Sequence, residues 1–352
     1  MITKTYSRDL SACNTFRMKV SCGVLIEYDS IVDLLSLDFE DMLQPVKHIG
    51  AGSNILFTRD FDGTILHSAV RFIEEIGGVG DEVLVSAGSG VVFDDLCEWA
   101  AGRGLWGPEN LSHIPGEVGA SAVQNIGAYG VEAKDIIRTV YAYDTVSGEF
   151  VHFDVSECGY GYRDSMFKSP GCQGRYIITH VVFAFSRKAA PVLGYGPVKA
   201  AVEAGGQPLT PALVREAITS IRKSKLPEVS EMGSAGSFFK NPVVSVVKYN
   251  EVLAEARTSI GPDVTVPHYE VSGSDGAPMV KIPAAWLIEQ CGWKGRRSGN
   301  AAVYEKQPLV IVNATGRALP EEIIALEDKV RVSVRSRFGI ELSPEVEHVP
   351  LL

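Results

Sequence analysis

Residues 109–130, which read ENLSHIPGEVGASAVQNIGAYG, limit the possible folds of this chain more than any other stretch. They contain glycine at positions 116, 119, 127 and 130 and only two charged residues, and most of them show no helical or strand period. The segment is too apolar for a solvated linker and too rich in glycine for an ordinary core element. We therefore predict a backbone that wraps closely around a large flat ligand, with a buried structural loop as the alternative.

A second glycine cluster follows a predicted strand that starts at residue 46. Its members are Gly50, Ala51, Gly52, Ser53 and Asn54. Such a turn gathers backbone N–H groups that suit phosphate oxygens. The cluster is neither a G-x-G-x-x-G dinucleotide fingerprint nor a P-loop, because no Gly-Lys-Ser/Thr follows. A phosphate-binding turn and a plain tight turn are both compatible with it.

The segment 233–242, GSAGSFFKNP, combines a flexible backbone with polar side chains. Gly233 and Gly236 let the backbone approach a ligand, and the two phenylalanines that follow would fix the segment by burial. The hydroxyl of Ser237, beside Lys240 and Asn241, suits a proton donor with polar support. The alternative is a tight turn that enters a strand, with its serines capping backbone groups.

Two further loops carry candidate side chains. One places Tyr162, Arg163 and Asp164 in succession. In the other, residues 191–197, Tyr195 is the only large side chain and lies between two glycines. A mobile tyrosine in that position suits a lid over a ligand, and a surface turn is the alternative.

Two lysines are candidates for neutralising a phosphate. Lys225 follows a predicted helix at 211–223, and Lys294 lies in a Trp-Lys-Gly turn. Positive charge at a helix end usually complements the helix dipole. Solvated surface charge is therefore the alternative for both.

The formal net charge of the 352-residue chain is -10 at pH 7. Nucleic acids and anionic membranes require a basic face, so we expect neither as a partner. No stretch approaches the roughly 18 apolar residues of a membrane span, and the polar N-terminus is not a secretory signal. The six cysteines show no C-x-x-C and no metal-like pairing with histidine. We expect reduced thiols, no bound metal and a cytoplasmic location.

Periodicity and turn residues predict both helices and strands. Strands are expected at 19–28, 46–57, 82–87, 176–186 and 309–313, with a hairpin at 139–154 that turns at Ser147 and Gly148. Helices are expected at 30–37, 92–103, 211–223, 245–257, 283–291 and 320–336.

Taken in chain order, the two glycine stretches, the Tyr-Arg-Asp loop, segment 233–242 and the Ser-Pro-Glu-Val sequence around Glu345 resemble the UDP-N-acetylenolpyruvoylglucosamine reductases. The Gly-Tyr-Gly loop is similar to the subgroup with a tyrosine lid. The resemblance runs from about Asn14 to Val346. It implies an α+β fold, with a two-part FAD-binding region of the vanillyl-alcohol-oxidase (PCMH) type and a smaller substrate-binding domain. The implied boundaries are 1–187 for the FAD-binding region, 188–210 for the tyrosine loop and linker, and 211–352 for the substrate domain.

The resemblance also implies an activity. It is the NADPH-dependent reduction of UDP-N-acetylglucosamine enolpyruvate to UDP-N-acetylmuramate for peptidoglycan, by a monomer that holds FAD non-covalently. His48 and His113 would be the attachment points if the flavin were covalent. The one departure from the family pattern is Ala51, where a third glycine is common, and a methyl group there is tolerated if the local φ is negative.

Site residues follow from the same resemblance. The implied FAD-binding residues are Gly50, Ala51, Gly52, Ser53, Asn54, Pro115, Gly116, Gly119, Asn125, Ile126 and Gly130. The implied catalytic residues are Arg163, Ser237 and Glu345. The implied substrate-binding residues are Tyr162, Tyr195, Lys225, Asn241, Tyr269, Lys294 and Gln307.

The implied chemistry fits these residue types. Hydride addition to the vinyl carbon of the substrate builds negative charge on the neighbouring carbon and its carboxylate. Arg163 would grip that carboxylate through two bonds, and Glu345 beside it would hold a proton to avoid repulsion. Ser237 would protonate the carbanionic carbon. Two alternatives remain, a flavin-dependent alcohol or sugar oxidase and a non-enzymatic nucleotide-sugar-binding protein.

Overall fold

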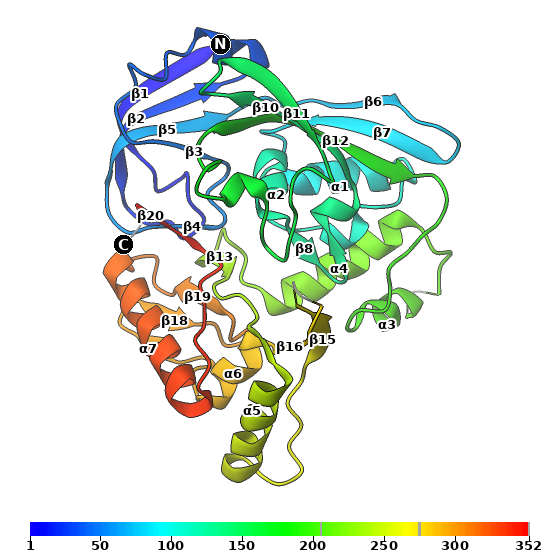
Figure 1. Cartoon of the computed structure of the whole chain (residues 1–352), viewed down its shortest axis with the longest axis vertical. Coiled ribbons are helices and arrows are strands. Elements are labelled where there is room, and N and C mark those ends of the chain that lie inside the picture. The colour runs from blue at the N-terminus through cyan, green and yellow to red at the C-terminus, as the bar shows by residue number, and fades with distance from the viewer. Residues whose placement is uncertain (205, 274–275, 351–352) are drawn as a thin grey trace. The chain divides into compact units, whose positions relative to one another are not determined.

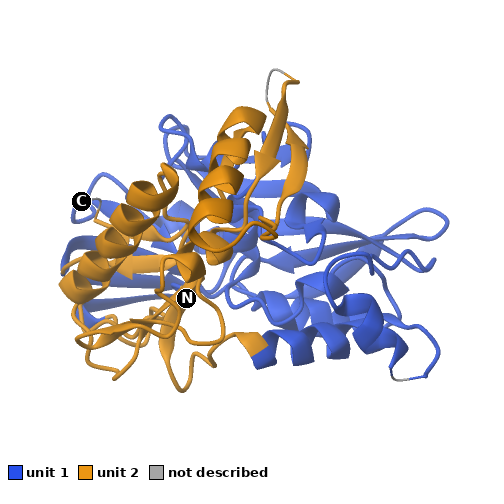
Figure 2. Cartoon of the chain, turned by 90° about the horizontal axis from the view of Figure 1, so that it is seen from below, with its two compact units in different colours: residues 1–9, 21–52, 60–224 blue, residues 10–20, 53–59, 225–352 orange. Residues whose placement is uncertain are grey.

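The computed structural model describes residues 1–204, 206–273 and 276–350 (Figure 1). The chain divides into two compact units, each assembled from separate stretches (Figure 2). Unit 1 consists of Met1–Asp9, Ser21–Gly52 and Asp60–Ser224. Unit 2 consists of Leu10–Val20, Ser53–Arg59 and Lys225–Leu352. Two short N-terminal segments therefore belong to the mainly C-terminal unit.

Unit 1 contains a four-stranded sheet in the order β1 (Ile2–Asp9), β2 (Ser21–Tyr28), β5 (Phe61–Ser68) and β3 (Val46–Ile49). β1 is antiparallel to β2, whereas β5 is parallel to β2 and to β3. Apolar side chains of this sheet pack with the 3-10 helix η1 (Ile31–Ser36) in one core cluster. The sequence does not predict β1, because its residues are largely polar and exposed and show no regular alternation.

The second sheet of unit 1 is antiparallel, in the order β11 (Glu149–Asp154), β10 (Ile137–Asp144), β12 (Tyr176–Ser186), β7 (Glu82–Gly88) and β6 (Ile73–Gly77). The helices α1 (Phe93–Ala101) and α2 (Val118–Gln124) share one apolar core with it. The predicted hairpin at 139–154 is confirmed, and Gly148 closes its turn by donating from N–H to the carbonyl of Asp144 over 2.9 Å. β12 has the predicted bounds.

Short elements complete unit 1. They are η2 (Glu109–Leu111), β8 (Gly127–Ala128), β9 (Val131–Glu132), η3 (Ala133–Asp135), η4 (Met166–Lys168) and α3 (Val198–Glu203). The longer helix α4 (Pro211–Lys225) follows, and only its last residue is assigned to unit 2. Thr210 begins α4 as predicted, because its hydroxyl accepts a hydrogen bond from the N–H of Leu213 over 3.2 Å. Val214 and Ile218 of α4 are fully buried in a cluster that also contains Trp106. The chain passes from unit 1 to unit 2 for the last time between residues 224 and 225. The sequence-based domain boundaries at 187/188 and 210/211 stay a prediction.

Unit 2 contains two further sheets. The first has the order β13 (Gly233–Ser237), β19 (Val310–Asn313), β18 (Ala301–Val303) and β17 (Arg297–Ser298). The second has the order β14 (Val243–Ser245), β16 (Pro278–Lys281) and β15 (Tyr269–Ser272). Their helices are α5 (Val246–Ser259), α6 (Ala284–Gln290) and α7 (Pro320–Phe338), and β4 (Ile55–Phe57) pairs in parallel with β20 (Glu347–Val349).

Three sequence-based expectations need correction. The strand expected at 46–57 is two strands, β3 and β4, because the chain turns through Gly52 at φ +63° between them. The stretch 109–130 contains a helix, α2, whose mostly small side chains hide its period. Segment 233–242, for which the sequence suggested a flexible backbone or a tight turn that enters a strand, begins with the strand β13 itself.

None of the described helices combines the length and the apolar character that a membrane crossing requires. All six cysteines are free thiols, and three of them, Cys22, Cys97 and Cys158, are buried. Among the residues that the structure describes, no three histidine, cysteine or acidic side chains form a possible metal-ligand set.

Candidate active site

In unit 2, Ser237 is the last residue of β13, where it pairs with Val310 of β19. The register shifts between Ser234 and Ser237, and Gly236 in between has φ +70°, a conformation that favours glycine. The next two side chains, Phe238 and Phe239, are 0% and 1% exposed. The predicted burial of the aromatic pair is therefore confirmed, and it anchors the half-buried Ser237 at the end of a strand.

The chain around Glu345 runs beside this strand end. The N–H of Glu345 donates to the carbonyl of Phe238 over 2.8 Å, and the N–H of Lys240 donates to the carbonyl of Ser343 over 2.9 Å. The side-chain amide of Asn54 donates to the carbonyl of Glu345 over 3.1 Å. Unit 2 thus brings together Ser237, Glu345 and Asn54, which are far apart in the sequence.

The other candidates of unit 2 lie on separate elements. Asn241 accepts the N–H of Ala284 over 2.9 Å and so caps the first residue of α6. Tyr269 of β15 is 44% exposed, with the ammonium of Lys281 5.9 Å from its ring centroid. Lys294 forms an exposed ion pair of 2.7 Å with Glu289.

Two remaining unit 2 candidates stand at element ends. Gln307 accepts the N–H of Val310 at its backbone carbonyl over 3.0 Å, in the turn before β19. Lys225 is the exposed last residue of α4. Neither arrangement by itself assigns a binding role.

In unit 1, the glycine stretch is fastened to the turn between β7 and α1. The N–H of Gly119 donates to the carbonyl of Ser89 over 3.0 Å, and a side chain at 119 would begin 2.8 Å from the Cβ of Ser89. The N–H of Phe93 donates to the carbonyl of Gly116, which has φ +127°. Ser89 thus leaves no room for a side chain at 119, and the positive φ of Gly116 favours glycine.

Asn125 ends α2 in the left-handed conformation, with φ +47°. Its buried side chain donates to the carbonyl of Gly161 over 2.8 Å and to the carboxylate of Glu132 over 3.0 Å. Its side-chain carbonyl accepts the N–H of Lys134 over 3.0 Å. Asn125 therefore ties the glycine stretch to the Tyr-Arg-Asp loop.

Arg163 reaches the glycine stretch from that loop. It is a non-glycine residue with φ +55°, and its Nη2 donates to the carbonyl of Gly127 over 2.7 Å. Its Nη1 lies 3.4 Å from the carbonyl of Asn125. Its guanidinium also lies over the ring of Tyr162, 5.6 Å from the centroid. These contacts hold the guanidinium in place. The backbone of Arg163 has a conformation that non-glycine residues rarely adopt.

The tyrosine loop is anchored by a residue that the sequence did not single out. Asn110 is fully buried, and its amide donates to the carbonyls of Tyr129 and Val192 over 2.9 and 2.8 Å. Tyr195 packs edge-on against Tyr129 with 6.3 Å between ring centroids. The loop 191–197 is therefore held against the glycine stretch.

Arg222 of α4 is a second missed residue, because its position near the helix end suggests only a dipole complement. Its Nε donates to the carbonyl of His113 over 3.1 Å. Burial lowers the pKa of Arg222, and the positive charge of Arg163 acts in the same direction. Unit 1 therefore concentrates two positive charges beside its glycine stretch.

These residues fit the predicted FAD site. Two buried polar side-chain atoms of the glycine stretch, Asn110 Oδ1 and Gln124 Nε2, have no hydrogen-bond partner among the described residues. Buried polar atoms normally have partners in the complete molecule. Their concentration around the glycine stretch therefore favours a polar ligand there.

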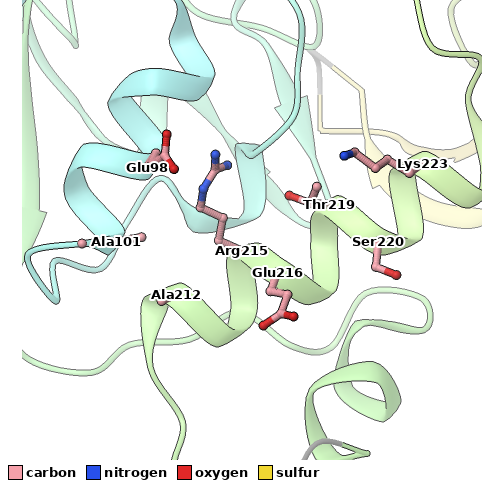
Figure 3. Close-up of a pocket in the computed structure, with 9 residues that line it drawn as sticks. Glu98, Ala101, Ala212, Arg215, Glu216, Thr219, Ser220 and Lys223 are labelled. Atoms are coloured by element: carbon pink, nitrogen blue, oxygen red, sulfur yellow. The ribbon is translucent and has the colours of Figure 1, made fainter.

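A groove of about 610 Å³ lies elsewhere in unit 1, between α1 and α4 (Figure 3). Arg215 points into it from α4 and forms a bidentate ion pair with the carboxylate of Asp94. None of the predicted site residues line this groove. We therefore do not place the predicted ligands in it.

Comparisons with known proteins identify both parts of the chain. The FAD binding domain family matches residues 39–154, and the C-terminal domain of UDP-N-acetylenolpyruvoylglucosamine reductase matches residues 228–349. The reductase of Bacteroides fragilis (strain YCH46) is 45% identical over 337 residues, which cover 96% of this chain and 97% of that protein. The reductase of Porphyromonas gingivalis (strain W83) is 42% identical over 344 residues, or 97% of each chain.

A solved structure shows the same fold. The crystal structure of the reductase from Thermus caldophilus aligns with a TM-score of 0.67 at 22% identity, and it covers 99% of this chain and 98% of that one. The expected fold class, an FAD-binding region followed by a smaller α+β domain, is confirmed. The chain therefore belongs to the UDP-N-acetylenolpyruvoylglucosamine reductase family of FAD-dependent oxidoreductases.

Proposed function

We propose that this protein reduces UDP-N-acetylglucosamine enolpyruvate to UDP-N-acetylmuramate for peptidoglycan synthesis, with NADPH as hydride donor and FAD as cofactor. The observation that carries the proposal is the sequence identity of 45% and 42% with two reductases over almost the whole chain. The juxtaposition of Ser237 and Glu345 in unit 2 supports it, because proton donation to a carbanion needs such groups.

The absorption spectrum of the purified protein tests this function. We expect a yellow chromophore that NADPH bleaches under anaerobic conditions and that UDP-N-acetylglucosamine enolpyruvate restores. A protein without flavin would contradict the proposal. Restoration by oxygen alone, with no response to the enolpyruvyl compound, would instead indicate an oxidase.

For FAD we propose a site built from the two glycine clusters. The residues that would hold it are Gly50, Ala51, Gly52, Ser53, Asn54, Pro115, Gly116, Gly119, Asn125, Ile126 and Gly130. When bound, FAD supplies the hydride chemistry between NADPH and the substrate. We propose that the flavin is held non-covalently. At His48, one of the two possible attachment points, Nε2 is engaged with the hydroxyl of Tyr28 at 3.0 Å.

For catalysis we propose three roles. Arg163 binds the substrate carboxylate, because a planar guanidinium can grip a carboxylate through two bonds, and the carbonyls of Asn125 and Gly127 hold the guanidinium in place. Glu345 is the third catalytic group, beside the carboxylate oxygens. Ser237 donates its hydroxyl proton to the carbon next to the carboxylate, where negative charge develops.

For the substrate we propose contacts with the UDP moiety and its sugar. The residues are Tyr162, Tyr195, Lys225, Asn241, Tyr269, Lys294 and Gln307. We propose that these residues contact the substrate in the bound state. We further propose that the enzyme works as a monomer in the cytoplasm, and sedimentation of the purified protein tests the monomeric state.

Removing the charge of Lys225 tests the phosphate contact. We expect Lys225→Met to raise KM for the UDP substrate about tenfold while kcat changes little, because a charge-assisted contact to phosphate acts equally in the ground and transition states. Steady-state kinetics measure both constants. Lys223→Met, an exposed lysine on the same helix, is the control and should match the wild type. Equal effects of the two variants would show only a general loss of positive charge.

Asn110→Ala tests the anchoring of the tyrosine loop. The substitution leaves the carbonyls of Tyr129 and Val192 without their buried donor, so we expect a loss of about 1–3 kcal/mol in unfolding free energy. We also expect a several-fold higher KM for the UDP substrate and faster proteolysis within 191–197. Unchanged protease resistance of the loop would show that other contacts hold it.

A further inference from the structure

A histidine that the proposed reaction does not use joins two carboxylates inside unit 1. Nε2 of His67, on β5, is 3.0 Å from Glu117, and Nδ1 is 3.1 Å from Glu27 of the adjacent strand β2. The side chain of Glu117 is only 5% exposed, that of His67 19% and that of Glu27 43%. A buried carboxylate is costly unless a cation or several donors accompany it. His67 supplies that partner for Glu117.

The surrounding groups favour the charged form of His67. The hydrogen bond with Glu117 raises the pKa of His67, burial opposes this, and Glu27 raises it further. On the other neighbouring strand, β3, Ile49 is the register partner of His67 and His48 that of Leu66. Burial lowers the pKa of His48 to about 3, so that it stays neutral. Lys47, beside His48, acts in the same direction on that ring.

Glu117 connects this ion group to the proposed FAD site. It immediately precedes α2, and the backbone N–H groups of Val118 and Gly119 donate to the carbonyls of Val91 and Ser89. A side chain at Gly50 would begin 3.0 Å from Oε2 of Glu117. The Glu117 carboxylate therefore packs directly against the backbone of Gly50 in the cluster 50–54, and Glu117 itself belongs to the glycine stretch 109–130.

A parallel link comes from the residue after His67. The hydroxyls of Ser68 and Ser89 are 2.7 Å apart and buried, and Ser89 in turn accepts the N–H of Gly119. Two consecutive residues of β5 thus contact two segments, at Glu117 and at Ser89, which are hydrogen-bonded to each other. The sheet thereby fixes the place of both glycine clusters relative to each other within unit 1.

We propose that His67, as a cation between Glu27 and Glu117, is a positioning residue for FAD. It holds the Glu117 turn against Gly50, so that the backbone groups of both clusters are preorganised for the cofactor. This inference rests on the proposed assignment of FAD to these glycines. It adds a pH dependence to cofactor binding that the chemistry of reduction does not require.

The sign of that dependence follows from the raised pKa. A histidine whose folded pKa is raised stabilises the folded site below its ordinary pKa of 6.5, and this contribution disappears as pH rises through the higher folded value. We therefore expect FAD to dissociate more readily from the holoenzyme on the alkaline side. Flavin fluorescence after dilution, from about pH 6 to about pH 9, measures the released fraction.

Three variants separate positioning from simple loss of structure. His67→Gln should weaken FAD binding about tenfold near neutral pH and flatten the pH profile, because the charge is gone. Glu27→Gln, at the more exposed end, should retain binding at low pH but shift the onset of release to lower pH, since Glu27 raises the pKa of His67. His152→Gln alters an exposed histidine of β11 and should match the wild type.

The outcomes distinguish this inference from the proposed function. A purified wild type that neither contains nor binds FAD would overturn both. FAD bound by His67→Gln with the affinity and pH profile of the wild type would overturn the inference alone. An unchanged onset of release in Glu27→Gln would also contradict it, even if His67→Gln proved too unstable to purify.

Discussion

Ser237→Ala is expected to slow the substrate-dependent half-reaction by about 10²–10⁴-fold while leaving oxidation of NADPH by the enzyme nearly intact. The hydroxyl is the proposed acid for the carbon next to the substrate carboxylate, and no acid is required when NADPH delivers its hydride. The site tolerates the change structurally, because the strand end is fixed by the buried rings of Phe238 and Phe239 rather than by the serine.

Rapid mixing under anaerobic conditions measures the two half-reactions separately. Ser234→Ala is a matched control, because Ser234 lies in the same strand and is buried, and its N–H donates to the carbonyl of Thr15 irrespective of its side chain. The control should affect stability more than either rate. If Ser237→Ala slowed both half-reactions to the same extent, the serine would have a structural role and another acid would be needed.

The parts of the fold that the sequence predicts well are those with local signals. β12 is rich in β-branched and aromatic residues, and its bounds are as predicted. α4 and α7 each begin with a proline at the first helical position, and α7 ends at Gly339 in the left-handed conformation. Each of these signals acts between residues only a few positions apart, so that one sequence suffices to detect them.

The parts that the sequence does not predict depend on distant partners. Asn110 and Val192 are 82 residues apart, and Arg222 and His113 are 109 apart. His67 and Glu117, which are 50 apart, give no local pattern that would connect them. α2 is missed for a different reason, since its mostly small residues create no apolar stripe.

The same distinction applies to the candidate site. The resemblance places Arg163, Ser237 and Glu345 as catalytic residues, and the structure adds which backbone groups orient them. It shows Glu345 bonded through its backbone to the residue after Ser237, which no spacing argument could supply. The roles of the three residues stay predictions until kinetics test them.

Arg163→Lys is expected to slow the substrate-dependent half-reaction by about 10²–10³-fold, the usual effect of removing one preorganised donor from developing negative charge. The guanidinium is held by the carbonyls of Gly127 and Asn125, and its planar fork matches the two oxygens of a carboxylate. A lysine ammonium is a single compact charge, so it cannot bind the same carbonyls and also present a planar fork.

The matched control is Arg175→Lys. The guanidinium of Arg175, also in unit 1, binds the carboxylate of Asp144 through two hydrogen bonds, from Nε over 2.9 Å and from Nη2 over 2.6 Å. That pair holds the pKa of Asp144 at about 2 and serves the hairpin turn, so its loss should reduce stability and spare turnover. A structural role for Arg163 would give the same result as the control. A selective loss in the substrate-dependent half-reaction, with NADPH oxidation preserved, would indicate that the Arg163 guanidinium contacts the substrate carboxylate. Near-normal turnover of Arg163→Lys would exclude that contact.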